Sequence, residues 1–286
     1  MNGRMNFSEP VPFQTKEIRC GVLRFEVIHL MKPVDRPPCF VIRVCKSEMN
    51  AQDPDQMKTV NARKSPASEK SLDIDRFMET LTEHYPEWNA PVVTLMAERG
   101  RSAFEILVST ILSLRTKDEV TLKASERLFA EAKTPRQILE MDIERLEKLI
   151  YPVGFYPTKA RRLQQISRIL IEKYQGRVPE TLEALLELPG VGRKTANLVM
   201  IEGWGQPAVC VDTHVHRISN RIGYVKTRTP DQTEQVLRGK LPHPYWIRYN
   251  ELLVAFGQTV CRPISPWCSR CPVAGMCPRV NVNRSR

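Results

Sequence analysis

The sequence predicts an all-α fold from about residue 71 onward, and two observations carry this prediction. Apolar residues recur there at spacings of three and four, which is typical of helices that bury one face. Strand-like alternation is nearly absent over the same stretch, and Pro and Gly mark segment ends, as at Pro157 and Gly176. With 286 residues, of which 42% are hydrophobic, the chain is long enough to bury a sizeable core.

Residues 1–70 differ from the rest of the chain. They hold two short strand-like runs, 22–31 (VLRFEVIHLM) and 39–45 (CFVIRVC), followed by a polar stretch that continues to about Ser71. This composition suits a poorly ordered arm or a small appendage. We expect an N-terminal extension over residues 1–70 that carries no chemistry of its own.

The helical segments follow in order. The segment 101–114 places five apolar residues on one face, and the segment 134–150 opens with Thr134 as N-cap and Pro135 at the first helical position. The segment 157–176 has a strongly basic polar face. Two more amphipathic segments, 229–241 and 245–258, lie near the C-terminus.

The chain is basic along its whole length. Its formal net charge is +11, with 12 Lys and Arg against 8 Asp and Glu in residues 1–70 and 31 against 24 in the remainder. A polyanion is the natural partner, nucleic acid before membrane. Because the sequence has no run of eighteen apolar residues and no signal pattern, we expect an intracellular protein with no membrane partner.

The segment 182–203 (LEALLELPGVGRKTANLVMIEG) is the most informative. A helix that reaches Leu188 breaks at Pro189, and a second helix restarts at Arg193 after a Gly-Val-Gly turn. The free N–H groups of the second helix form a ready phosphate site. The pattern predicts a helix–hairpin–helix that binds a DNA backbone; an ordinary turn between two helices is the alternative. The predicted DNA-binding residues are Leu188, Gly190, Val191, Gly192 and Arg193.

Lys194 follows the hairpin directly, and Asp212 comes eighteen residues later in VCVDTHVHRISNRIG. Taken singly, Lys194 could be one more phosphate contact and Asp212 could merely cap the helix that follows. Together with the hairpin, they are candidates for chemistry.

Four cysteines crowd near the C-terminus, namely Cys261, Cys268, Cys271 and Cys277, with six, two and five residues between them. Two disulfides are the least favoured assignment for an intracellular protein. Only Cys268 and Cys271 form a C-x-x-C pair, so the spacing alone leaves both a zinc ion and an iron–sulfur cluster open. The other cysteines, Cys20, Cys39, Cys45 and Cys210, are expected to be free thiols, with Cys210 buried.

From about Ser71 to Pro278 the chain resembles the endonuclease III branch of the helix–hairpin–helix DNA glycosylase superfamily. The segments LPGVGRKTAN and VDTHVHR and the cysteine spacing carry this resemblance. It implies a two-lobed helix–hairpin–helix DNA glycosylase fold: a six-helix barrel lobe over about residues 97–206, and a cluster lobe formed by 71–96 and 207–280. It also implies that the four cysteines hold a 4Fe–4S cluster.

The resemblance further implies a bifunctional DNA glycosylase/AP lyase, expected to be a monomer, that acts on double-stranded DNA with a damaged base or abasic site. It would remove oxidised pyrimidines and cleave the strand by β-elimination, with Lys194 as nucleophile and Asp212 as acid/base and electrostatic residue. A mismatch or adenine glycosylase of the same superfamily and a non-catalytic DNA-binding iron–sulfur protein are the alternatives.

Two positions vary from the family's pattern. Arg115 stands where the bacterial pattern has a glutamine that enters the gap left by the flipped base. Phe155 stands where the family places a leucine wedge, and an aromatic ring there could stack into the duplex. The alternative for Phe155 is plain core packing.

Overall fold

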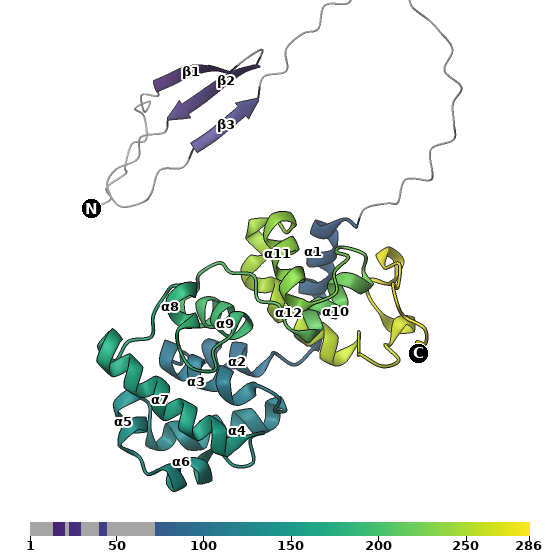
Figure 1. Ribbon diagram of the computed structural model, residues 1–286. Coiled ribbons are helices and arrows are strands. Elements are labelled where there is room, and N and C mark those ends of the chain that lie inside the picture. Colours follow the sequence, from purple (N-terminus) through teal and green to yellow (C-terminus); the bar gives the residue numbers. More distant parts are fainter. Residues whose placement is uncertain (1–13, 21–22, 30–39, 45–71) are drawn as a thin grey trace, which may run out of the picture. The chain divides into compact units, whose positions relative to one another are not determined.

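The computed structural model describes residues 14–20, 23–29, 40–44 and 72–286, and the chain divides into two compact units, Met1–Pro66 and Ala67–Arg286 (Figure 1). In the first unit, β1 (Gln14–Cys20), β2 (Leu23–His29) and β3 (Phe40–Val44) form an antiparallel sheet in the order β1-β2-β3. In its register, Gln14 pairs with His29 and Phe25 pairs with Val44. The two strand-like runs contain β2 and β3, whereas β1 was not predicted; the rest of the predicted extension lies outside the described residues.

In the described part of the second unit, residues 72–286, all regular elements are helices, so the all-α prediction is confirmed there. Among the described helices, none combines the length and the apolar content that crossing a bilayer requires. The helices are α1 (Ile74–His84), α2 (Val92–Glu98), α3 (Ala103–Ser113), α4 (Asp118–Glu131), α5 (Pro135–Glu140), α6 (Ile143–Ile150), α7 (Tyr156–Tyr174), α8 (Leu182–Leu186), α9 (Arg193–Trp204), α10 (Thr213–Arg221), α11 (Pro230–Lys240) and α12 (Trp246–Thr259).

Local chemistry explains several helix ends. Ser102 and Glu105 form a capping box at α3, and Thr134 and Gln137 form another at α5, which confirms the predicted N-cap. The segment predicted as helical from Thr134 is divided into α5 and α6, because Met141 is extended after Glu140. The predicted helix from Pro157 is α7.

Two large buried clusters form the cores of the second unit. One joins apolar side chains of α3 to α9, and the other joins α1 and α10 to α12 with the cysteine segment. Each fully buried Leu or Phe in them contributes roughly 1.5–3 kcal/mol. Figure 1 shows α1 beside α11 and α12, with the C-terminal segment next to them.

The helix α2 belongs to neither large cluster and packs mainly against helices of the first. It packs against α3, α4 and α9, and a small cluster around Met96 includes Ile106 and Leu198. The predicted boundary between residues 96 and 97 therefore cuts through a helix that packs with the barrel helices. The bounds of the two lobes stay a prediction.

Candidate active site and nucleic-acid interface

The hairpin connects α8 to α9 through residues 187–192. Gly190 is left-handed, with φ at +78°, and a Cβ there would lie 2.9 Å from Cδ of Arg162. Gly192 is the N-cap of α9 and provides no side-chain cap. A Cβ on Gly192 would meet no atom within 4 Å. The positive end of the α9 dipole therefore has room for a ligand on its axis.

None of the five predicted hairpin residues offers a free side chain, since two are glycines and the other three are buried or paired. Leu188 and Val191 are 1% and 6% exposed, so their side chains belong to the core and only their backbones can approach DNA. The guanidinium of Arg193 donates to both carboxylate oxygens of buried Glu234, over 2.8 Å and 2.6 Å. This ion pair fixes the start of α9 against α11, and it engages the Arg193 guanidinium with Glu234 in place of a DNA phosphate.

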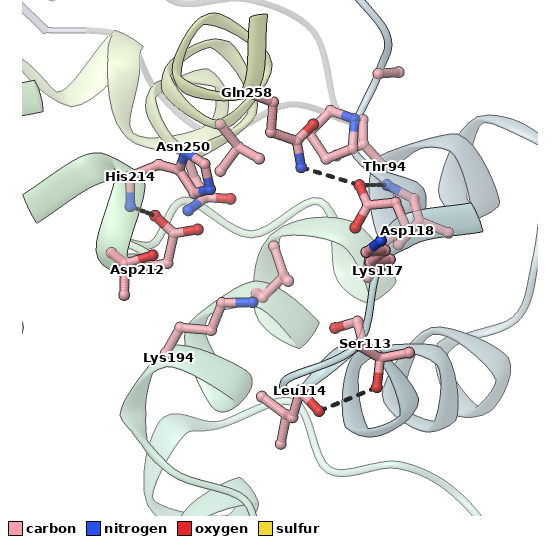
Figure 2. Close-up of a pocket in the computed structure, with 18 of the residues that line it drawn as sticks. Thr94, Ser113, Leu114, Lys117, Asp118, Lys194, Asp212, His214, Asn250 and Gln258 are labelled. Atoms are coloured by element: carbon pink, nitrogen blue, oxygen red, sulfur yellow. Dashed lines mark hydrogen bonds between the residues drawn. The ribbon is translucent and has the colours of Figure 1, made fainter. Parts of the chain in front are cut away.

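Lys194 and Asp212 line one pocket of about 1110 Å³. Lys194 is the second residue of α9, and Asp212 is the N-cap of α10. Figure 2 shows Lys194 extending toward the middle of the pocket, with Asp212 on one side and Asp118 on the other. The structure thus brings together the two residues proposed for chemistry.

Asp212 is a helix cap as well as a pocket residue. Its Oδ1 accepts hydrogen bonds from the backbone N–H groups of His214 (2.8 Å) and Val215 (2.9 Å). Both bonds go to the same oxygen, and Oδ2 has no partner among the hydrogen bonds of residues 72–286. The capping bonds therefore fix the orientation of a carboxylate whose second oxygen is available to a ligand.

Sequence reasoning missed other polar residues of this pocket. Asp118 accepts from the backbone N–H of Val92 (3.3 Å) and from Nε2 of Gln258 (3.2 Å), which joins α2, α4 and α12 at the pocket wall. Burial lowers the pKa of His214, which favours a neutral imidazole. Gly257 makes room for this ring, because a Cβ there would lie 2.5 Å from Nδ1 of His214. The VDTHVHR segment contained His214, but no spacing in it indicated a role.

Arg115 and Phe155 lie together on the surface of the protein. Both residues are exposed and left-handed, with φ at +54° and +59°, and the Arg115 guanidinium lies 5.8 Å from the centre of the Phe155 ring. Phe155 is 63% exposed, so core packing does not explain it.

The four C-terminal cysteines line one cavity, and none of the described cysteines forms a disulfide. Buried Arg221 donates from Nη1 to Sγ of Cys261 over 3.5 Å, and the backbone N–H of Arg279 donates to Sγ of Cys277 over 3.4 Å. Trp267 lines the same cavity, and its indole N–H has no hydrogen-bond partner among the described residues. These donors suit an anionic thiolate group. Cys210 lies outside this loop and is buried, as predicted.

The described residues contain no group of three or more His, Cys, Asp or Glu placed to hold a single metal ion. A zinc ion needs its thiolates at about 2.3 Å from one point, whereas in a 4Fe–4S cluster each thiolate binds its own iron. The four thiols share one cavity, so the donor set fits a group that is held by four thiolates.

Comparison with known proteins follows this geometry. Residues 108–243 match the family described as HhH-GPD superfamily base excision DNA repair protein. The chain is 52% identical over 174 residues to endonuclease III of Thermotoga maritima, covering 61% of this chain and 82% of that protein. It is 42% identical over 201 residues to endonuclease III-like protein 1 of Mus musculus, covering 66% and 67%. A solved non-covalent endonuclease III–DNA complex superposes with a TM-score of 0.65 at 34% identity, covering 72% of this chain and 94% of that chain.

Fold, pocket and matches together define a base excision DNA repair enzyme of the helix–hairpin–helix class. The chain belongs to the endonuclease III family. It is accordingly a DNA glycosylase/AP lyase.

Proposed function

We propose that this enzyme binds double-stranded DNA with an oxidised pyrimidine or an abasic site, releases the damaged base, and cleaves the strand by β-elimination. The observation that carries the proposal is the meeting of Lys194 and Asp212 in one pocket, each at the start of a helix (Figure 2). A solved relative, 34% identical, is described as a trapped covalent intermediate of endonuclease III with DNA, which supports attack by a protein nucleophile.

The chemistry assigns one step to each group. The damaged nucleotide leaves the duplex and enters the pocket, since its glycosidic carbon is poorly accessible within the stack. The neutral amine of Lys194 attacks C1′, the bond from C1′ to the base breaks, and the base takes up a proton as it leaves. The free oxygen of Asp212 stabilises the cationic sugar and helps to move protons.

The bond between Lys194 and C1′ becomes a Schiff base once the sugar ring opens. Loss of a proton from C2′ then breaks the bond between C3′ and its phosphate oxygen, and this completes the strand cleavage. A glycosylase that activates water in place of an amine would not need Lys194 in the pocket.

The hairpin holds the backbone of the bound DNA. The N–H groups at the start of α9 face an opening that has no side-chain cap, and phosphate oxygens suit such a site. Arg115 and Phe155 present a charged and an aromatic side chain that can fill the gap left by the extruded nucleotide.

We further infer that Cys261, Cys268, Cys271 and Cys277 hold a 4Fe–4S cluster, supported by the shared cavity, the Arg221 guanidinium and the unpartnered indole N–H of Trp267. When bound, the cluster supplies a cross-link of four thiolates and contributes to folding of the loop. The monomeric state and the intracellular location stay predictions from the sequence.

The test uses duplexes that contain thymine glycol, uracil, a G·T mismatch or an abasic site, each incubated with borohydride. We expect base release and a covalent adduct with thymine glycol, and an adduct with the abasic site. Thymine release from the G·T mismatch without any adduct would instead favour the mismatch glycosylase. DNA binding without reaction on any duplex would favour the non-catalytic alternative.

A further inference from the structure

Lys159 is a buried charge that the proposed chemistry does not use. It lies on α7 and is 5% exposed. Its ammonium donates to the carbonyl oxygens of Leu112 (2.8 Å) and Leu114 (2.6 Å) and contacts Oγ1 of Thr116 at 3.3 Å. The two carbonyls belong to the end of α3, where backbone oxygens lack helical partners and where a cation is favoured.

Burial is also the main cause that lowers the pKa of Lys159, to about 8. The amine is thus largely protonated at neutral pH. Three oxygen acceptors take its three N–H donors, which is the full donor capacity of a lysine.

The ammonium also reaches a second loop, through Thr116. In that loop the carbonyl oxygen of Phe155 accepts an ordinary helical hydrogen bond of α7, from the backbone N–H of Lys159 over 3.0 Å. Next to it, the backbone N–H of Gly154 donates to Oγ1 of Thr116 over 3.1 Å. A Cβ on Gly154 would lie 2.7 Å from the carbonyl oxygen of Arg115, so the two loops approach as closely as only glycine permits.

These bonds surround two strained residues. Arg115 and Phe155 are both left-handed, a conformation that a residue with a side chain keeps only when its surroundings enforce it. Both are exposed and their side chains stack. The ammonium of Lys159 bonds to the residues on both sides of Arg115, Leu114 and Thr116. The same Thr116 oxygen accepts from Gly154, the neighbour of Phe155, so the ammonium is the link common to both loops.

We propose that Lys159 is a positioning residue for base extrusion, whose buried ammonium fixes Arg115 and Phe155 as one exposed pair that enters the duplex beside the lesion. This inference rests on the proposed function, because it requires that the pair enters DNA. Without the ammonium, the carbonyls of Leu112 and Leu114 lose a charged donor and the loop around Arg115 relaxes away from Phe155.

The test compares two reactions of the full chain that differ in their need for the pair. Base release from a thymine glycol duplex requires extrusion of a stacked base. Borohydride trapping on an abasic site that faces a one-nucleotide gap requires Lys194, but there is no base to extrude and no opposite base to displace. We expect Lys159→Met to slow base release about 10- to 100-fold, the loss typical of misplaced binding groups, and to leave trapping nearly unchanged.

Lys148→Met is the matched control. Lys148 is an exposed lysine on α6. The control variant should carry out base release and trapping at the rates of the unchanged protein. Selective loss in Lys159→Met alone supports the proposal, whereas normal base release, or an equal fall in both reactions that follows the melting temperature, overturns it.

A double-mutant cycle separates positioning from general support of the fold. If Lys159 acts through the exposed pair, Lys159→Met should slow base release no further in a protein that already carries Arg115→Ala and Phe155→Ala. Additive losses overturn the proposal.

If Lys159→Met does not fold, Gly154→Ala pushes the loops apart without changing the buried lysine, and it must show the same selective loss for the proposal to stand.

Failure of the proposed function is a different result. It would appear in the unchanged protein as absence of base release and of trapping, whereas every comparison with Lys159→Met requires an active unchanged protein.

Discussion

Lys194 supplies the reactive amine in the proposed mechanism, and its removal separates chemistry from binding. The hairpin and the exposed pair do not depend on its side chain. Lys194→Ala should therefore abolish covalent trapping by borohydride and most strand cleavage, while damaged duplex still binds. Electrophoresis of the trapped adduct, together with a binding titration, measures both. A trapped adduct formed by Lys194→Ala would show that another amine attacks.

Asp212 caps α10 with one carboxylate oxygen and offers the other to the substrate, and replacement by asparagine tests the two roles separately. Asn caps a helix about as well as Asp, so Asp212→Asn should melt close to the unchanged protein. It removes the negative charge beside the sugar, and loss of one such electrostatic group slows reactions about 10²–10³-fold. Single-turnover base release from a thymine glycol duplex should fall by that order.

A purely capping Asp212 gives the opposite pattern. Asp212→Ala would then cost about 1 kcal/mol of stability, and Asp212→Asn would leave turnover nearly normal. Melting curves for both variants, recorded beside the rates, distinguish these cases.

At the scale of elements, the hairpin contains two glycines that serve different purposes. Gly190 is required by its left-handed backbone and by Arg162, so Gly190→Ala should destabilise the fold by about 1–2 kcal/mol. Gly192 is not left-handed and meets no neighbour, so Gly192→Ala should fold normally. Its methyl group would instead stand where a phosphate approaches α9. Affinity for damaged and undamaged duplex should fall together, as fluorescence anisotropy can measure.

The contrast between the two glycines is the test. If Gly192→Ala bound undamaged duplex as tightly as the unchanged protein, the start of α9 would not be the backbone contact.

Glu202 links α9 to α2 and predicts a pH dependence of stability. Its Oε1 accepts from Oγ1 of Thr94 over 2.6 Å, and burial raises its pKa to about 7 from an ordinary value of 4.5. Between these two values the folded state binds more protons than the unfolded state, so this group makes stability fall as the pH rises. Glu202→Gln should remove this fall in stability. The melting temperature at about pH 8, relative to that at about pH 5, should therefore be higher in the variant than in the unchanged protein. Exposed Glu144→Gln on α6 is the control and should keep the fall in stability.

At the scale of the whole molecule, sequence patterns predicted those features that are encoded locally. Apolar spacing predicted an all-α fold for residues 72–286, the Pro-Gly-Val-Gly turn predicted the hairpin, and the cysteine spacing identified the residues that share a cavity. Each of these depends on residues close in the chain. The packing of α2 against α9 was not predictable in this way, because it joins residues about one hundred positions apart.

The same limit applies to the pocket and its support. Asp118 and His214 meet at one pocket only after α4 and α10 have packed, and no periodicity places them there. The bidentate pair of Arg193 with Glu234 likewise depends on α11 reaching the hairpin. Lys159 looked like part of a basic helix face, whereas the fold buries it against the end of α3.

If the cysteine loop holds the proposed cluster, it should depend on that metal group for order. The loop contains only the short 3-10 turns Cys268–Arg270 and Ala274–Met276, and its start is fixed by the guanidinium of Arg221, which donates to the carbonyl oxygens of Arg262 and Pro263. Cys268→Ser should lose iron, and limited proteolysis should then cut the C-terminal segment first, because metal binding there contributes folding energy. Stoichiometric zinc without iron in protein purified without oxygen would contradict the cluster.

The positive charge of the whole chain predicts how binding responds to salt. When a lysine or arginine neutralises a phosphate, counterions leave the DNA, and the logarithm of the binding constant falls with the logarithm of salt concentration by about 0.9 for each phosphate.

Arg162 is exposed and lies against Gly190, so it is placed to contact the phosphate next to the hairpin. Arg162→Ala should therefore weaken all duplexes alike and reduce this slope by about 1. Lys148→Ala changes an exposed position of α6, a helix that lies away from α8 and α9 in Figure 1, and should leave the slope unchanged. Gly192→Ala supplies the third comparison, because it removes an approach to neutral N–H groups: it should lower affinity at every salt concentration with nearly the same slope. Equal slopes for Arg162→Ala and the unchanged protein would mean that the phosphate at the hairpin is held by the backbone of α9 alone.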